Sequence, residues 1–284
     1  MTSSNIGIRH TNIWKVIHCL CEVGTMVNNS EDINEKNPGQ SQGINHPTLE
    51  AFYHKYRIYA TEVYRNMTRR KIPRVVEEVK KEYNVPLSTT NKNECFIVNG
   101  KSVMLSDAAM RDIVFSFLQE QLKKTTFDSV LEIGCGSGNN LKVLQKRFPA
   151  KTFYGLDLAE QMIKEAQVNV PAVKFFCCSA EHIPLEDNSV DVIYTVHALE
   201  QMTPFIPAVI KEMKRVCRNR VLFIEPFPEF QNWIGRMHGK RLGYPTTVHS
   251  EMQANGFTIE TFKSLNFGNP VNKSGILVGL KKKE

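Results

Sequence analysis

The sequence lacks paired cysteine motifs and long hydrophobic runs. Its seven cysteines are odd in number and form no CxxC pair, so neither a disulfide framework nor a cysteine-rich zinc site is indicated. Cys177 and Cys178 are adjacent in an expected strand, where their side chains point to opposite faces and cannot hold one metal ion. The apolar stretch 13–21 is interrupted by Lys15 and His18 and is too short for a membrane span or secretory signal. We therefore expect free thiols, no metal, no membrane span and a cytoplasmic location.

Acidic side chains are in deficit. The chain has 36 Lys and Arg against 29 Asp and Glu, a formal net charge of +7. This surplus suits an anionic acceptor or RNA, and it also suits an ordinary, mildly basic globular protein. The hydrophobic fraction of 42% supports a core and excludes a disordered chain. A length of 284 residues fits one large domain with an extension.

The first third of the chain changes character at two points. Residues 1–46 combine a short helical pattern with a polar stretch rich in Asn and Gly, which predicts a flexible segment. Residues 47–106 contain helical patterns followed by two β-prone runs around Asn99-Gly100, a dipeptide that favours a two-residue hairpin turn. We expect residues 47–106 to form a helical and hairpin lid on the domain that follows.

Strands and helices alternate through residues 107–284. The expected strands are 129–134, 152–158, 173–180, 190–196 and 220–226, followed by a terminal pair near 257–265 and 274–280. Strands separated by helices predict a doubly wound parallel sheet, and their apolar character indicates burial on both faces. We predict an α/β, Rossmann-like, seven-stranded and mostly parallel sheet with an antiparallel C-terminal hairpin strand. In such sheets ligands bind beyond the carboxyl ends of the strands.

A glycine-rich loop follows the first of these strands. Its glycines, Gly134, Gly136 and Gly138, alternate with other residues and let the backbone approach a ligand where a Cβ would collide. The GxGxG spacing differs from the dinucleotide fingerprint GxGxxG. Glu132 precedes the loop, and a carboxylate there would repel a pyrophosphate but suit a ligand with an ammonium and a sulfonium.

The run V-L-E-I-G-C-G-S-G at 130–138 resembles the first motif of class I S-adenosylmethionine-dependent methyltransferases, and the resemblance extends over about 120–284. It implies a methyltransferase enzyme with S-adenosylmethionine as cofactor. It also implies the residues around the methionine part of that cofactor: Glu132, Gly134, Cys135, Gly136 and Gly138. The alternative interpretation is a structural glycine turn or another nucleotide-binding fold.

Acidic and polar residues follow the second and third strands. Asp157 lies 19 positions after Gly138, where a carboxylate accepts hydrogen bonds from the two ribose hydroxyls. Its alternative role is to cap the helix that begins near residue 159. We expect Leu158 and Met162 beside the ribose and adenine.

The third strand ends in Ser179-Ala180-Glu181, and the resemblance places all three near the adenine. Relatives commonly carry an aspartate at the position of Ser179. A serine hydroxyl accepts a hydrogen bond from the adenine amino group more weakly than a carboxylate does.

The catalytic candidates follow the fourth and fifth strands. His197 begins H-A-L-E-Q, which resembles the H-x-L-E-H of relatives, and a histidine is a natural base for a hydroxyl acceptor. Thr195, just before it, is a candidate cofactor contact. Glu225 ends the fifth strand and is a candidate for orienting the acceptor. For His197 and Glu225 the alternative is a purely structural role. Residues 233–244 are expected to be irregular and to wall the acceptor pocket.

Some methyl-transfer reactions are disfavoured. No N-P-P-Y-like motif follows the fourth strand, no Pro-Cys dipeptide supplies a nucleophile for pyrimidine C5 chemistry, and no acidic cluster suits magnesium. We expect methylation of oxygen or nitrogen in a small-molecule, biosynthetic acceptor. Two alternatives stay open: an RNA or protein methyltransferase that uses the basic stretch 65–81, and a non-catalytic module that binds S-adenosylmethionine.

Overall fold

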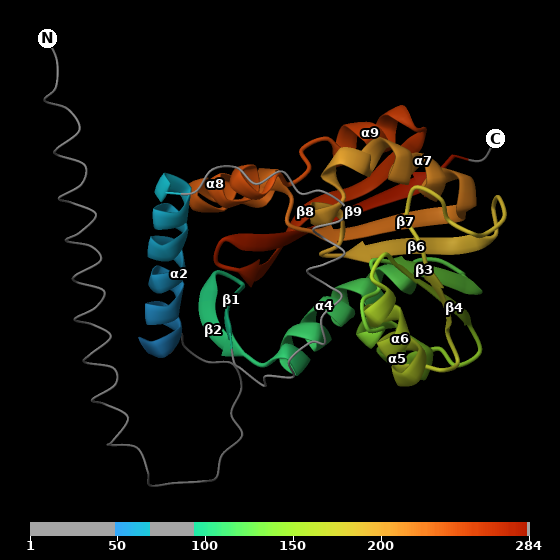
Figure 1. Ribbon diagram of the computed structural model, residues 1–284, viewed down its shortest axis with the longest axis horizontal. Coiled ribbons are helices and arrows are strands. Elements are labelled where there is room, and N and C mark those ends of the chain that lie inside the picture. Colours follow the sequence, from blue (N-terminus) through green and yellow to red (C-terminus); the bar gives the residue numbers. More distant parts are fainter. Residues whose placement is uncertain (1–48, 69–93, 283–284) are drawn as a thin grey trace, which may run out of the picture.

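The computed structural model describes residues 49–68 and 94–282 (Figure 1). Nine strands form one sheet in the order β2-β1-β8-β9-β7-β6-β3-β4-β5. The strands are β1 (Glu94–Val98), β2 (Lys101–Leu105), β3 (Ser129–Ile133), β4 (Thr152–Asp157), β5 (Lys174–Cys177), β6 (Val190–Val196), β7 (Cys217–Glu225), β8 (Phe257–Asn269) and β9 (Asn272–Lys281). The helices are α2 (Leu49–Thr68), α4 (Asp107–Leu122), α5 (Asn139–Arg147), α6 (Glu160–Asn169), α7 (Ile206–Val216), α8 (Trp233–Leu242) and α9 (Val248–Ala254).

The predicted parallel sheet is confirmed. Strands β7, β6, β3, β4 and β5 pair in parallel, and β9 lies antiparallel between β7 and β8. The chain leaves β3 toward β4 and β5 and then returns to β6 on the other side of β3. This reversal opens a crevice at the carboxyl ends of β3 and β6, where doubly wound sheets bind their ligands.

The predicted count of seven strands is wrong for this sheet, because the hairpin β1-β2 extends it. Asn99 and Gly100 form the turn with φ angles of 49° and 82°. Strand β1 pairs with β8 through Val98 and Phe267, and the rings of Phe96 and Phe267 stack 5.6 Å apart. The hairpin is therefore an edge of the sheet, and the lid expected over 47–106 has no support from it. Residues 1–48 and 69–93 lie outside the described residues.

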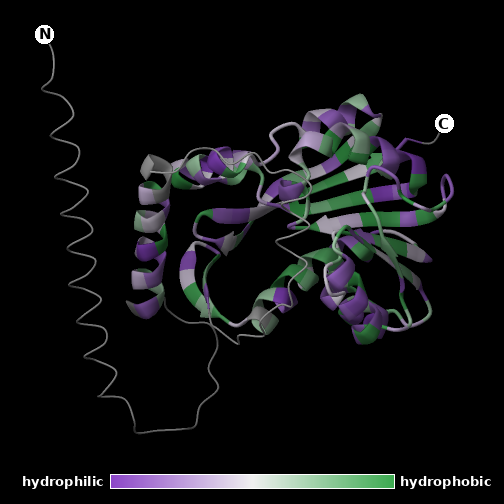
Figure 2. Cartoon of the chain, in the orientation of Figure 1, coloured by the Kyte–Doolittle hydropathy of each residue, from purple (hydrophilic) through white to green (hydrophobic). Residues whose placement is uncertain are grey.

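Helices cover both faces of the sheet. On one face Leu118 of α4 and Leu144 of α5 are fully buried against β3, β6 and β7. On the other, Met213 of α7 and Met252 of α9 are fully buried. Figure 2 shows the central strands as mostly hydrophobic and the helices as mixed. Of the described helices, none has the length and apolar character that a bilayer span needs.

Residues 233–242, expected to be irregular, form helix α8. Asn232 begins the helix, with its Oδ1 accepting a hydrogen bond from the Gly235 N–H at 2.9 Å, and Gly243 ends it at a φ of 74°. Gly235 and Gly239 lower the helix propensity of this segment, and for this reason the sequence did not predict a helix here.

Helix α8 packs on α2 at one end of the molecule (Figure 1). Both Nε and Nη2 of Arg241 donate to Oε1 of Glu62, at 3.0 and 2.9 Å, and both side chains are buried. The Asn232 amide also donates to the Tyr59 hydroxyl at 3.0 Å. These polar contacts therefore fix α2 to α8.

Candidate functional site

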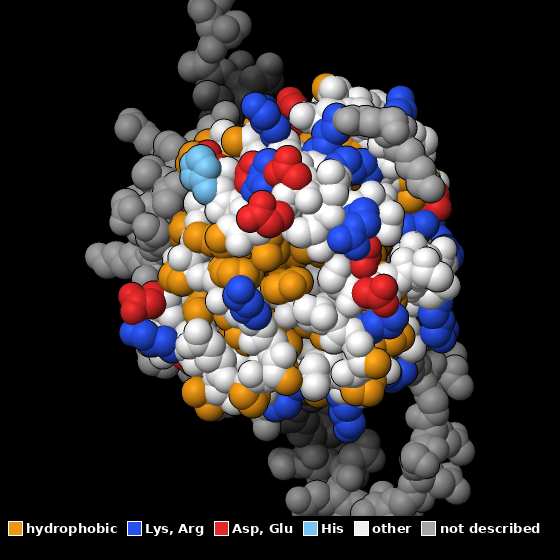
Figure 3. All heavy atoms as spheres, turned by 90° about the vertical axis from the view of Figure 1, so that its right-hand side faces the viewer, with side chains coloured by type: hydrophobic (Ala, Val, Ile, Leu, Met, Phe, Trp, Pro, Cys, Tyr) orange, Lys and Arg blue, Asp and Glu red, His pale blue; other side chains and the backbone are white. Residues whose placement is uncertain are grey.

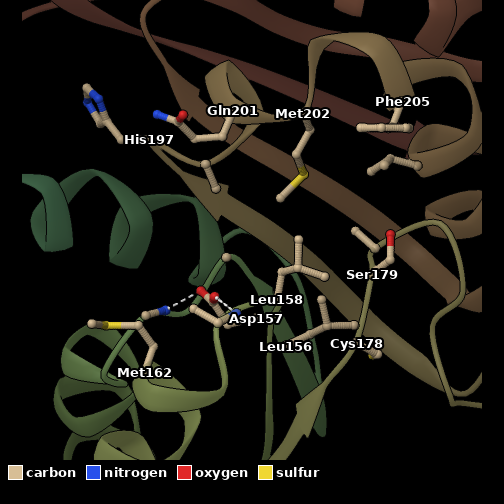
Figure 4. Close-up of a pocket in the computed structure, with 16 residues that line it drawn as sticks. Leu156, Asp157, Leu158, Met162, Cys178, Ser179, His197, Gln201, Met202 and Phe205 are labelled. Atoms are coloured by element: carbon tan, nitrogen blue, oxygen red, sulfur yellow. Dashed lines mark hydrogen bonds between the residues drawn. The ribbon is translucent and has the colours of Figure 1, made fainter. Parts of the chain in front are cut away.

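A cleft lies at the carboxyl ends of β3, β4, β5 and β6 and encloses about 920 Å³, part of it open to solvent (Figure 4). Eight of the residues predicted from the sequence line it: Gly134, Gly136, Asp157, Leu158, Met162, Ser179, Ala180 and His197. They come from four separate strand ends, and the fold brings them together as a doubly wound sheet requires.

Asp157 binds two backbone N–H groups, one of them in the glycine loop, and does not cap α6, whose N-cap Ala159 has no side-chain hydrogen bond. Its Oδ1 accepts a hydrogen bond from the Ala159 N–H at 2.9 Å, and its Oδ2 accepts one from the Gly136 N–H at 2.8 Å. Burial raises the pKa of this carboxyl, while the backbone N–H groups of Ala159, Gly136 and Leu158 act in the opposite direction. The carboxylate lines the cleft and has about four acceptor positions in all.

The glycines of the loop have different roles. A Cβ on Gly136, at a φ of 50°, would meet no protein atom within 4 Å and would project into open space at the cleft. A Cβ on Gly134 would lie 2.4 Å from that of Ala198, so this glycine allows the turn after β6 to approach. Gly138 lies outside the cleft and starts α5 in close contact with Phe175. The open cradle at Gly136 fits a ligand that contacts bare backbone.

Glu132 and Cys135 do not line the cleft, although they belong to the same motif. The Glu132 side chain points into the core, where its Oε1 accepts a hydrogen bond from the Asn140 amide at 2.7 Å. Burial raises its pKa to about 8, which favours the neutral form of this carboxyl. The Cys135 thiol is also buried, which raises its pKa.

The expected adenine end of the cleft is mainly apolar. The Ser179 hydroxyl donates to Glu181 Oε2 at 3.2 Å and accepts from the Glu181 N–H at 3.3 Å, so it is already engaged. Glu181 itself does not line the cleft. Met202 and Phe205 form the opposite wall, in a turn that sequence reasoning passed over (Figure 4). In the sequence, only their apolar character, between the fourth strand and the helix that follows it, could have indicated that Met202 and Phe205 line the cleft.

His197 lines the cleft in a left-handed backbone conformation, with a φ of 51°. Its N–H donates to the Ile224 carbonyl at 3.0 Å. The ring Nε2 lies 2.8 Å from the Ser274 hydroxyl on β9, and Nδ1 lies 3.9 Å from Glu200 Oε2. The loop-fixing hydrogen bond weighed from the sequence is therefore present. His197 lines the cleft, and its ring points away from Asp157 (Figure 4). Ser274 is distant in the sequence and carried no signal.

Glu225 is buried and shares its hydrogen bonds with the turn after β6. Its Oε1 accepts from the Thr195 hydroxyl at 2.7 Å and from the Ala198 N–H at 3.0 Å. Burial raises its pKa to about 8, and the neighbouring Glu200 acts in the same direction. Neither Glu225 nor Thr195 lines the cleft. Their buried side chains contact each other at the carboxyl ends of β7 and β6. This position favours the structural role.

The described part of the chain contains no group of three or more His, Cys, Asp or Glu side chains that could hold a metal ion. Cys177 is exposed, whereas Cys178 is half-buried and lines the cleft. The absence of a metal cofactor stays a prediction.

Comparison with known proteins places the cleft within a recognised domain. Residues 131–224 match the family described as "Methyltransferase domain". The chain is 32% identical over 144 residues to a probable phthiotriol/phenolphthiotriol dimycocerosates methyltransferase 2 of Mycobacterium ulcerans, covering 48% of this chain and 55% of that protein. It is 40% identical over 86 residues to a malonyl-[acyl-carrier protein] O-methyltransferase of Bacillus cereus, covering 30% and 32%. The matched part is thus about a third to a half of these relatives.

The fold has a solved counterpart. A geranyl diphosphate C-methyltransferase from Streptomyces coelicolor A3(2), in complex with Mg²⁺, geranyl diphosphate and S-adenosyl-L-homocysteine, aligns with a TM-score of 0.53 at 11% identity. The alignment covers 75% of this chain and all of that one, and at this identity it shows a shared fold. The family match, the relatives and this fold confirm the resemblance seen in the sequence. Residues 131–224 are therefore a methyltransferase domain, and its fold is the one that solved S-adenosylmethionine-dependent methyltransferases share.

Proposed function

We propose that the protein transfers the methyl group of S-adenosylmethionine to an oxygen or nitrogen atom of a small-molecule acceptor in a biosynthetic pathway. The cleft carries this proposal: bare backbone at Gly136 and a carboxylate at Asp157 lie on one side, and the His197 ring lies on another. The relatives support it, because their names describe methyltransferases and one of them an O-methyltransferase.

The cofactor, when bound, supplies a methyl group already activated by a sulfonium. The chain then has to align the acceptor with that methyl group and exclude water. Asp157 would hold the ribose hydroxyls, and the loop at Gly136 would hold the methionine part. Met202 and Phe205 supply the apolar wall that displaces water from this side of the cleft.

His197 is the proposed base. With Nε2–H donating to the Ser274 hydroxyl, Nδ1 keeps its lone pair for the acceptor proton. Glu200, 3.9 Å from Nδ1, stabilises the imidazolium that forms. Base catalysis of this kind contributes about 10²–10⁴-fold where the acceptor must lose a proton. We propose no direct role for Glu225, which acts through the turn that presents His197.

The alternatives from the sequence stay predictions. The basic stretch 65–81 lies mostly outside the described residues, so an RNA or protein acceptor has no structural support from it. On the face shown in Figure 3, Lys and Arg are interspersed with Asp and Glu around a central apolar area. This face lacks the single-sign surface that nucleic acid binding favours.

The test uses the full-length protein. Calorimetry should detect binding of S-adenosylmethionine and S-adenosylhomocysteine and none of NAD. A panel of hydroxyl, amine and carboxylate compounds should then include at least one that releases S-adenosylhomocysteine, at a rate unaffected by tRNA. Preference for NAD would contradict the cofactor site. Methylation of tRNA, with a strong dependence on salt, would instead select the RNA alternative.

A further inference from the structure

A second cavity encloses about 850 Å³, part of it open to solvent. Helix α8 forms one wall, and the loop after β7 and the turn after β6 form the others (Figure 1). The lining residues that matter here are Thr203, Pro226, Gln231, Arg236, Lys240 and Tyr244.

The two spaces are close in the chain, although they share no lining residue. Met202 lines the cofactor cleft, and the next residue, Thr203, lines the cavity. On the other side His197 contacts Ser274, whose neighbour Lys273 binds the Gln231 side chain through its backbone N–H and carbonyl, at 2.9 and 2.6 Å. An acceptor seated in the cavity would have to pass Met202 and His197 to reach the cofactor.

The lining of the cavity is mainly apolar and carries two exposed cations, Arg236 and Lys240. Arg236 and Lys240 are one turn apart on α8, and no Asp or Glu is among the lining residues. The Nε of Arg236 donates to the Gln231 carbonyl at 3.0 Å, which orients the guanidinium and leaves its two outer nitrogens for a ligand.

The pairing of nearby arginines sets Arg236 apart. The other four arginines between residues 215 and 241 each form an ion pair with a carboxylate: Arg215 with Asp187 and Glu212, Arg218 with Asp191, Arg220 with Glu260, and Arg241 with Glu62. Within residues 49–68 and 94–282, neither Arg236 nor Lys240 has such a partner. Two unpaired cations that line a cavity attract an anion.

We propose that this cavity binds an anionic group of the methyl acceptor, a carboxylate or a phosphate, through Arg236 and Lys240. The inference rests on the proposed function, because it assigns the acceptor class of the same site. A guanidinium holds either group through two parallel hydrogen bonds, and an ammonium adds a point charge. An acceptor fixed at its anionic end presents its nucleophile to the methyl group at a set distance. The cavity thus selects acids over their neutral analogues.

The experiment uses the full-length protein saturated with S-adenosylhomocysteine, so that the cofactor cleft cannot bind the probe. Calorimetric titrations use malonate, inorganic phosphate and the neutral analogue malonamide. We expect at least one anion to bind, and malonamide not to bind. Arg236→Gln and Lys240→Gln should each weaken anion binding at least tenfold, and Arg236→Lys should give an intermediate loss.

Lys124→Gln is the matched control, since Lys124 is an exposed lysine that pairs with Glu120 and does not line the cavity. Its affinity for the anions should equal that of the wild type. The ratio of malonate to phosphate affinity separates a carboxylate acceptor from a phosphorylated one. Absence of anion binding, or equal binding by wild type, Arg236→Gln and Lys240→Gln, would overturn the inference. Failure of S-adenosylhomocysteine to bind would instead count against the proposed function.

Discussion

Gly136 and Asp157 are joined by a hydrogen bond in which the glycine N–H donates to Oδ2 of the carboxylate at 2.8 Å. The bond connects the loop after β3 to the end of β4, so these strand ends are fixed relative to each other before a ligand arrives. Preformed sites lose less entropy on binding than sites that must be ordered. The same carboxylate that we assign to the ribose therefore also shapes the cradle for the methionine part.

Replacement of Asp157 should weaken cofactor binding. Asp157→Ala removes both the ribose acceptor and the anchor of the glycine loop, and we expect affinity for S-adenosylmethionine to fall at least tenfold. Calorimetry measures the effect. Asp128→Ala is the control, because Asp128 is a 93% exposed carboxylate at the start of β3 whose loss should leave affinity unchanged. Equal affinity in wild type and Asp157→Ala would contradict the ribose assignment.

Gly136→Val should abolish cofactor binding, because its side chain would project into the cleft. Gly100→Val supplies the control for backbone strain: Gly100 also has a positive φ and open space around its Cβ position, but it lies in the β1-β2 turn. Both variants should lose roughly 1–2 kcal/mol of stability from the left-handed conformation. Equilibrium dialysis with S-adenosylhomocysteine should show binding by Gly100→Val alone. Normal binding by Gly136→Val would remove the loop from the site.

His197→Asn tests the proposed base. Asparagine tolerates the left-handed backbone that His197 adopts, whereas alanine would add strain to the loss of the ring. With an identified acceptor, kcat should fall about 10²–10⁴-fold and the Kd for S-adenosylmethionine should change little. Equal losses in kcat and cofactor affinity would indicate a structural role.

Stability should decrease between about pH 4.5 and pH 8 because of Glu225. Its pKa is about 8 in the folded protein and ordinary when unfolded, so in this window the folded state binds more protons. The free energy of unfolding then falls as pH rises, and it levels off above pH 8. Glu225→Gln keeps an acceptor for Thr195 and should reduce the slope only in part, because Glu132, whose pKa is also about 8, contributes in the same window. Urea unfolding at several pH values measures it, and an unchanged slope would refute the assignment.

The sequence predicted the parallel sheet and most of the cleft because that information is local. Gly136, Asp157 and Ser179 each come directly after an apolar strand, and the rule for ligand position in doubly wound sheets brings such residues together. Chain order and residue type were sufficient for this part of the site.

The remainder depends on contacts between distant segments. Strand β1 pairs with β8, and Ser274 contacts His197, across separations that no local pattern encodes. The directions of Glu132 and Glu225 were also inaccessible, because packing decides whether a carboxylate at a strand end turns into the core or toward the ligand. Helix α8 was hidden by its glycines.

The contact between Glu62 and Arg241 bears on how fragments of this protein would behave. The methyltransferase match covers 131–224 and excludes both residues. A truncated chain starting at residue 107 would keep the cofactor cleft. It would lack helix α2, which packs on α8, and would leave Arg241 without the Glu62 carboxylate. Such a fragment would be informative about cofactor affinity and misleading about acceptor choice, since α8 supplies Arg236 and Lys240.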